Sequence, residues 1–275
     1  MINVQKPLAE GLFEEYLRSQ GLDWEYESLA GQKKPDYVVC HSSSRCIFEI
    51  KELGDPDPRP TGGFDPDRPV RKKIRRAREQ FREYKDHCCN LVIFNRSVFG
   101  SADPGVVLAA AFGPGFQQDG RDYSRVDPAP PRYRFVRKSE LPPHLHSLSE
   151  PMLTRDANRT FSALVVLARY ELNELHLEVW KRLYARQQAG ESLAPGESLR
   201  TLAEMGSTPA MPSRFAGTVR VIVMENRYAR IPFPQDLFRG PFDQRWGWEG
   251  EWCTPVWLGT TLRSLGEEGV PFHLL

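Results

Sequence analysis

The first third of the chain changes from helical to strand-like spacing of its hydrophobic positions. Apolar side chains recur at the spacing of one helix face over residues 7–19, which predicts a helix. Period-two alternation and β-rich composition then predict strands at 22–28, 36–41 and 45–52. The polar segment HSSSR joins the second and third of these runs and predicts a hairpin turn.

A loop, a helix and a buried strand follow. Residues 54–69 are crowded with Pro, Gly and Asp, which predicts a loop. An apolar stripe over residues 70–86 predicts the clearest helix of the chain, and the run at 90–97 predicts a buried strand. The resulting order of helix, three strands, helix and strand indicates the α/β class.

The remainder of the chain carries weaker signals. Residues 98–150 contain many Gly and Pro, and the C-terminal stretch is rich in Pro, Gly and Trp. Four further elements are predicted: strands at 132–139, 160–172 and 219–226, and an amphipathic helix at 175–188. Because no composition shift divides the chain, we expect a single α/β domain over 1–275, with a core at about 7–97 and an elaborated C-terminal half at about 98–275.

Composition excludes several classes without selecting one. The 275 residues are 40% hydrophobic and 27% charged with a net charge of +1, as in ordinary globular proteins. The five cysteines form no C-x-x-C pair, which argues against a zinc ribbon or disulfide framework and favours reduced thiols in a cytoplasm. The first residues lack the pattern of a signal peptide, and the longest apolar run, 163–168, is too short for a bilayer, so we expect no membrane association.

Three charged residues lie where the pattern predicts a core hairpin. Asp36 begins the second strand, and Glu49 and Lys51 lie on one face of the third, because side chains alternate along a strand. Two neighbouring carboxylates repel each other unless a cation lies between them or the pKa of one is raised. Hard oxygen ligands favour Mg²⁺, with Mn²⁺ as a substitute, and a nearby lysine can orient a water or neutralise a phosphate. The set predicts a hydrolytic site for a phosphodiester.

These residues resemble the PD-(D/E)XK nuclease superfamily. Its motif stands here as Pro35-Asp36, twelve intervening residues, and Glu49-Ile50-Lys51. The first helix is similar to that of the Holliday-junction-resolvase-like nucleases, and Gln80-Phe-Arg-Glu-Tyr84 resembles the Q-x-x-x-Y element of RecB-like nucleases. The resemblance covers roughly residues 7–97.

The resemblance implies a fold, an activity and a set of roles. The fold would be a restriction-endonuclease-like core of order α-β-β-β-α-β, with a mixed sheet flanked by helices. The activity would be metal-dependent hydrolysis of nucleic-acid phosphodiesters, with DNA as the expected substrate.

The resemblance also implies roles for individual residues. Asp36, Glu49 and the carbonyl of Ile50 would bind Mg²⁺, and Glu10 would complete the metal site, with Glu14 as second choice. Lys51 would position the attacking water, and Gln80 would support it from the same helix face as Tyr84.

The second predicted helix is strongly basic. RKKIRRAREQFREYK, residues 71–85, has eight basic residues and two acidic ones. Beside a metal site such a face would hold a phosphate backbone. The candidate contacts are Arg71, Lys72, Lys73, Arg75 and Arg76. A homodimer or a partner protein is compatible with this interpretation.

Each interpretation has a simpler alternative. The charged hairpin could instead lie at an exposed edge of the sheet, with Glu49 and Lys51 in a surface salt bridge. Glu10 could be a first-turn carboxylate that interacts favourably with the helix dipole. The basic helix could present a solvated charged face. The Trp-rich segment 246–257 would stack on bases or form a buried aromatic cluster. For the whole chain the alternative is a catalytically inactive, nuclease-like subunit that binds nucleic acid or a partner protein within a larger machine.

Overall fold

The computed structural model describes residues 6–29, 31, 33–42, 44–54, 67–96, 104–113, 115–118, 132–136, 151–173, 186, 215–240 and 243–257. Its helices are α1 (Leu8–Ser19), α2 (Arg68–Gln80), the 3-10 helix η1 (Phe81–Glu83) and α3 (Pro104–Phe112). Its strands are β1 (Asp23–Tyr26), β2 (Tyr37–His41), β3 (Ser44–Leu53), β4 (Cys88–Asn95), β5 (Gly115–Gln118), β6 (Tyr133–Val136), β7 (Phe161–Asn173), β8 (Phe215–Glu225), β9 (Gln244–Glu249) and β10 (Trp252–Trp257).

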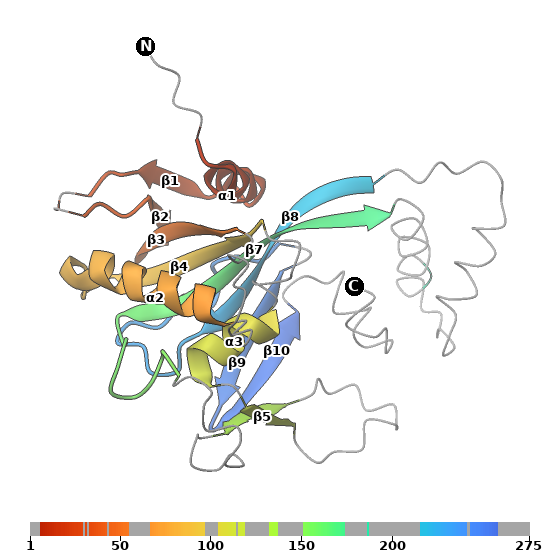
Figure 1. Ribbon diagram of the computed structural model, residues 1–275. Coiled ribbons are helices and arrows are strands. Elements are labelled where there is room, and N and C mark those ends of the chain that lie inside the picture. Colours follow the sequence, from red (N-terminus) through yellow and green to blue (C-terminus); the bar gives the residue numbers. More distant parts are fainter. Residues whose placement is uncertain are drawn as a thin grey trace, which may run out of the picture.

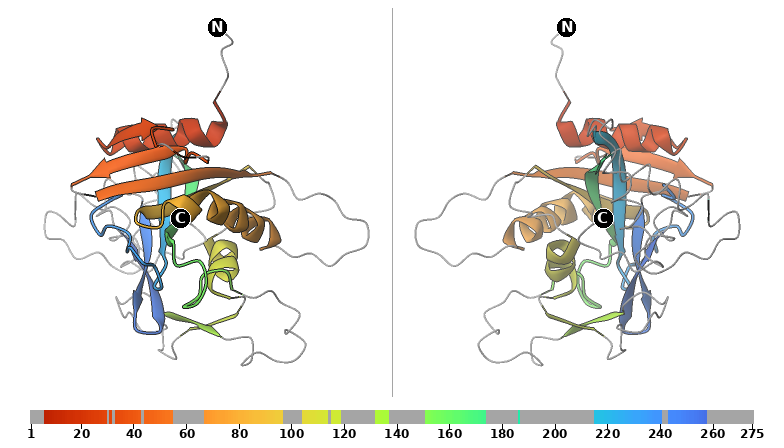
Figure 2. Two further views of the ribbon diagram at one scale, coloured as in Figure 1. Left: turned by 90° about the vertical axis from the view of Figure 1, so that its left-hand side faces the viewer. Right: turned by 90° about the vertical axis from the view of Figure 1, so that its right-hand side faces the viewer.

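The strands form one mixed sheet that twists strongly along its length (Figures 1 and 2). Its ten strands lie in the order β1-β2-β3-β4-β7-β8-β9-β10-β6-β5. β1, β2 and β3 pair as an antiparallel meander, and β3, β4 and β7 pair in parallel. β8 is antiparallel to β7 and parallel to β9, and the remaining pairs are antiparallel. β3 and β4 therefore lie inside the sheet, away from either edge.

Helices cover both faces of the sheet (Figure 1). One face packs against α1, and the opposite face packs against α2 and α3. Alternation along β3 supplies both cores, because Phe48 and Ile50 point toward α1 whereas Ile47 and Leu53 point toward α2. The same alternation places Glu49 and Lys51 on the α2 face.

The N-terminus of α1 is joined to the sheet beside the charged motif. Pro7 precedes the helix. The backbone N–H of Ala9 lies in the first turn, where no acceptor within the helix is available, and it donates to Glu52 Oε1 at 2.8 Å. Phe13 packs against Phe48 and Phe238, with ring centroids 5.3 and 6.2 Å away. These contacts fix the first turn of α1 next to the end of β3.

The order α-β-β-β-α-β expected for the first third is present, and so are the strands expected around 132–139, 160–172 and 219–226. The helix expected over 70–86 is shorter, because α2 ends at Gln80 and continues only as η1. The helix α3 and the strands β5, β9 and β10 were not predicted. The helix expected at 175–188 lies outside the described residues apart from position 186.

All five cysteines are free thiols. Among the described residues, no helix combines the length and the apolar character needed to cross a membrane.

Candidate functional site

Glu49 and Lys51 occupy an interior strand. β3 pairs with β2 on one side and with β4 on the other, so the alternative of an exposed edge hairpin is wrong. Glu49 is completely buried beneath α2, whereas the Lys51 side chain keeps a quarter of its surface exposed. A charged pair in such a position requires partners, because an isolated buried carboxylate is costly.

Asp36 lies against the middle of the Glu49-Ile50-Lys51 motif. It precedes β2, and its Oδ2 accepts a hydrogen bond from the backbone N–H of Ile50 at 2.6 Å. Burial raises its pKa, with a smaller contribution from Glu27, while the Ile50 N–H and the Lys51 ammonium lower it. The antiparallel pairing of β2 and β3 thus brings Asp36 to the motif, as the hairpin predicted.

Glu49 has the most perturbed environment of the motif. Its Oε1 accepts from the Lys51 ammonium, and Gln80 at the end of α2 also hydrogen-bonds to its carboxylate. Burial raises the pKa of Glu49 to about 7, and the charge of Asp36 adds to the rise, while Lys51 and Gln80 oppose it. The carboxyl therefore exchanges its proton near neutral pH, which is common for functional groups.

Glu10 rather than Glu14 belongs to this group. Burial and the charge of Asp36 raise the pKa of Glu10, against a hydrogen bond from Tyr26. Glu14, one turn later, instead pairs with Lys6 at 2.5 Å and accepts from the Tyr37 hydroxyl at 2.9 Å. The helix-dipole alternative explains why a carboxylate suits the first turn of α1, but it does not explain the proximity to Asp36.

The carboxylate oxygens of this group are the type of ligand that a hard divalent cation such as Mg²⁺ prefers. Glu10 Oε2 and Glu49 Oε2 are buried oxygens without a hydrogen-bond partner among the described residues. Buried acceptors normally have a partner, and a bound cation or a water would supply one to these two oxygens. In the arrangement seen, the described residues contain no group of three or more His, Cys, Asp or Glu side chains placed to hold a metal. The Glu49 carboxylate is turned toward Lys51, and an Asp36 oxygen is committed to the backbone.

The basic residues of α2 divide into two groups. Arg71 does not belong to an exposed phosphate-binding face, because it is buried and pairs with Asp67 one turn earlier. Lys73 is partly buried, and its pKa is lowered by burial and by the charges of Arg76, Lys51 and Lys72. Lys73 therefore stands beside Lys51.

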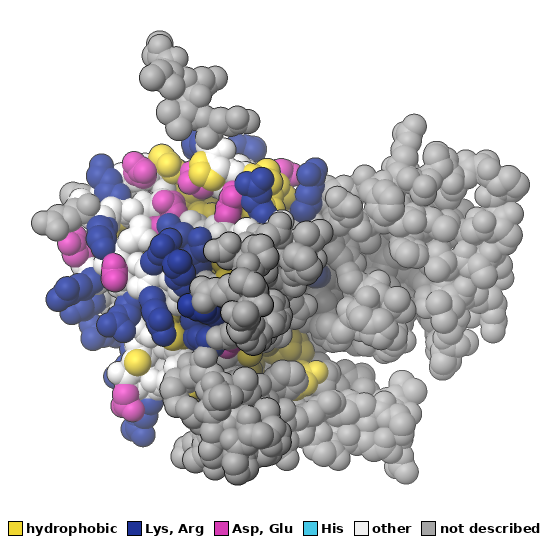
Figure 3. Space-filling model, in the orientation of Figure 1, with side chains coloured by type: hydrophobic (Ala, Val, Ile, Leu, Met, Phe, Trp, Pro, Cys, Tyr) yellow, Lys and Arg dark blue, Asp and Glu magenta, His cyan; other side chains and the backbone are white. Residues whose placement is uncertain are grey.

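The other basic side chains of α2 are exposed. Lys72, Arg75 and Arg76 point to solvent, and basic side chains gather over this part of the molecule in Figure 3. The alternative of a solvated charged face describes these three residues equally well. Their neighbour Lys73 extends the positive charge toward the candidate site.

Tyr84 does not share a helix face with Gln80. Since α2 ends at Gln80, the i, i+4 relation expected for one helix is lost. Tyr84 is buried, and its hydroxyl donates to the carbonyl of Lys33 at 3.2 Å. Of this pair, Gln80 is the residue that hydrogen-bonds to Glu49.

The Trp-rich segment 246–257 forms the β9–β10 hairpin and packs as an aromatic cluster. Trp248 stacks edge-on against Phe112 with centroids 4.9 Å apart and lies 5.7 Å from the Phe135 ring. Trp246 lies 5.6 Å from Tyr133. These contacts favour the packing alternative over base stacking for the two tryptophans.

Comparison of the chain with protein-family models, with curated proteins and with solved structures gives no match. The function of the chain is therefore inferred from the geometry of these side chains.

The raised pKa of Glu49 predicts a pH-dependent stability. The folded pKa, about 7, exceeds the usual 4.5, so the folded state binds the proton more tightly than the unfolded state. The stabilising contribution is full below about pH 4.5 and is lost as pH rises through 7. Urea denaturation in EDTA should show wild type losing about 3 kcal/mol relative to Glu49→Gln between pH 4.5 and pH 8. A difference that stays constant over this range would contradict the environment described for Glu49.

Proposed function

We propose that the protein is a metal-dependent nuclease that hydrolyses phosphodiester bonds, with DNA as the expected substrate. The observation that supports this most directly is the convergence of four separate segments on one buried acidic group: Glu10 from α1, Asp36 from the β1–β2 connection, Glu49 and Lys51 from β3, and Gln80 from α2. The order α-β-β-β-α-β, with β1–β3 antiparallel and β3–β4 parallel, agrees with the restriction-endonuclease-like core that the sequence resemblance implies.

The chain's residues divide the work of such a reaction. Mg²⁺ or Mn²⁺ would be held by the carboxylates of Asp36, Glu49 and Glu10 and by the carbonyl of Ile50. When bound, the metal would lower the pKa of a water molecule and neutralise charge on the phosphate. Lys51 keeps its partly exposed ammonium at the Glu49 carboxylate, where it can position a water and offset negative charge on a phosphate. Gln80 holds the Glu49 carboxylate in place.

The second candidate is a nuclease-like subunit that binds nucleic acid or a partner protein without cutting. The observation that favours it is the lack, among the described side chains, of a three-ligand group arranged for a metal. The two buried, unpartnered carboxylate oxygens favour the catalytic proposal instead. Metal binding separates these candidates, because only the first requires it.

Purified protein incubated with supercoiled plasmid, single-stranded DNA and RNA would test the proposal. We expect cutting of DNA in Mg²⁺ or Mn²⁺ and no cutting in EDTA. Isothermal titration with Mn²⁺ in the absence of substrate supplies a second readout, and binding should weaken below pH 7 because protons compete for Glu49. Absence of both cutting and Mn²⁺ binding would reject the catalytic proposal.

A further inference from the structure

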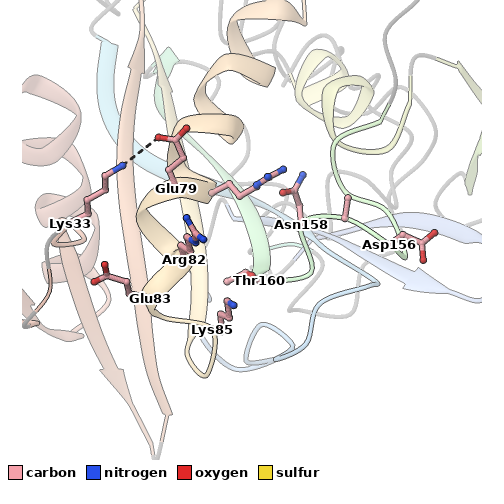
Figure 4. Close-up of a pocket in the computed structure, with 10 residues that line it drawn as sticks. Lys33, Glu79, Arg82, Glu83, Lys85, Asp156, Asn158 and Thr160 are labelled. Carbon is pink, nitrogen blue, oxygen red and sulfur yellow. Dashed lines mark hydrogen bonds and ion pairs between the residues drawn. The ribbon is translucent and has the colours of Figure 1, made fainter.

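A polar cavity of about 830 Å³ lies beyond the C-terminal end of α2. Residues of the last turn of α2 and of η1 form one wall, and the segment that leads into β7 forms the other. Figure 4 shows Arg82, Lys85 and Thr160 around the same space, with Asn158 on the far side. None of these residues takes part in the candidate acidic site.

The cavity has an excess of positive charge. Lys33 and Glu79 pair at its rim, with Nζ and Oε2 3.4 Å apart (Figure 4). Arg78, Arg82 and Lys85 also line it and pair with no carboxylate of the described residues, while Glu83 and Asp156 are the remaining acidic lining residues. Three cations against two carboxylates favour an anionic ligand, and two arginines suit phosphate, whose geometry matches the guanidinium fork.

The wall opposite the arginines is held in place by hydrogen bonds. Asn158 adopts a left-handed backbone with φ of 58°, and its Nδ2 donates to the carbonyl of Met152 at 2.5 Å. The side chain of Asn226, at the end of β8, donates to the carbonyl of Phe161 at 2.8 Å. The Thr160 hydroxyl is thereby presented from a fixed segment. This wall therefore needs little further ordering when a ligand binds.

The cavity continues the basic side of α2. Arg75, Arg78 and Arg82 follow at spacings of three and four residues, so they lie along one side of the helix and its 3-10 extension. Gln80, which contacts Glu49, is the last residue of α2 and lies between Arg78 and Arg82 in the sequence, although its side chain leaves the helix on another side. From Arg75 to Arg82 this row spans roughly 11 Å, which exceeds the length occupied by one phosphate.

We propose that this cavity is a second phosphate-binding site, which holds the backbone of the same nucleic-acid strand whose phosphodiester lies at Glu49 and Lys51. This inference depends on the proposed function and extends it, because it gives the substrate a direction along α2 toward η1 and β7. Phosphate contacts of this kind set the register of a nucleic acid without reading its sequence.

Binding of labelled single-stranded and duplex DNA to the full chain in EDTA tests the site. The variant is Arg78→Ala/Arg82→Ala, and the matched control is Arg18→Ala/Arg45→Ala, which removes two arginines from α1 and β3. Loss of two phosphate contacts should weaken binding at least about tenfold and reduce the slope of log K against log salt by roughly 1.4 for single strands or 1.8 for duplex. The control should match wild type in both values.

The outcomes separate the two proposals. Binding and salt slope unchanged in the double variant, with wild type binding well, would overturn the second site and leave the nuclease proposal standing. Failure of wild type to bind any DNA or RNA would overturn both. If inorganic phosphate binds wild type but not the variant while DNA binding is unaffected, the cavity takes free phosphate, and the strand-binding proposal is wrong. Lys85→Ala supplies an independent variant should the double variant prove unstable in thermal unfolding.

Discussion

Glu49→Gln is expected to lower the rate of metal-dependent DNA cleavage by about a thousandfold or more while the protein stays folded. The amide keeps the size of the side chain and its contact with Gln80, but it removes the buried negative charge that a divalent cation requires. Removal of one catalytic group from an active site typically costs a factor of a hundred to several thousand in rate. The measurement is single-turnover cleavage of a labelled duplex at saturating Mg²⁺.

Lys51→Met and Glu25→Gln complete this test. Lys51→Met keeps the length of the apolar stem and deletes the ammonium that contacts Glu49, so we expect a loss of similar order with Mn²⁺ binding retained. Glu25 lies exposed on β1, where it pairs with Arg45 at 3.3 Å, and Glu25→Gln should leave the rate unchanged. Cleavage by Glu49→Gln at the rate of Glu25→Gln would place the chemistry elsewhere.

The arrangement of the candidate site followed from local periodicity. Alternation along one strand puts Glu49 and Lys51 on a common face wherever that strand lies in the sheet. The short turn between β2 and β3 fixes their register, so Asp36 had to come close to Ile50. These features require no knowledge of distant contacts, which is why the sequence predicted them.

Two residues of the same region were assigned wrongly because their orientation depends on tertiary context. The sequence pattern predicted Arg71 to be one of the exposed cations of a basic helix. In the structure it is buried and pairs with Asp67, a residue that was predicted to lie in a loop. Tyr84 lost its helical relation to Gln80 because α2 tightens into a 3-10 turn at Phe81. Burial of Phe81 against Phe161 of β7 fixes that turn, and β7 lies far away in the sequence.

The second half of the fold was harder to predict for a different reason. α3 reads PGVVLAAAF and is apolar on almost every side, so it lacks the amphipathic period that identifies a helix. β10 contains Pro255, and proline argues against a strand in a sequence pattern because it has no backbone N–H to donate to a neighbouring strand. The insertion of β7 beside β4, and of β9 beside β8, depends on pairing across long stretches of chain. Local periodicity carries no information on such pairing.

Asp243→Ala is expected to be the most destabilising single substitution outside the apolar core. Asp243 is buried just before β9, and its carboxylate accepts from the Tyr16 hydroxyl, from Val221 N at 2.9 Å and from Gly240 N at 2.6 Å. It thereby joins α1 to β8 and to the segment that precedes β9. Alanine would leave three buried donors unpaired, which should lower the free energy of unfolding by about 3 to 5 kcal/mol in urea denaturation.

Tyr16→Phe distinguishes loss of this network from simple loss of packing volume. Phenylalanine keeps the ring, whose centroid lies 5.2 Å from that of Phe238, and deletes only the hydroxyl. Alone it should cost about 1 to 2 kcal/mol, because Asp243 keeps its two backbone donors. In the Asp243→Ala background it should cost nothing or restore stability, since the orphaned hydroxyl is removed. Strict additivity of the two substitutions would show that Tyr16 and Asp243 are energetically independent and that α1 is held by apolar packing alone.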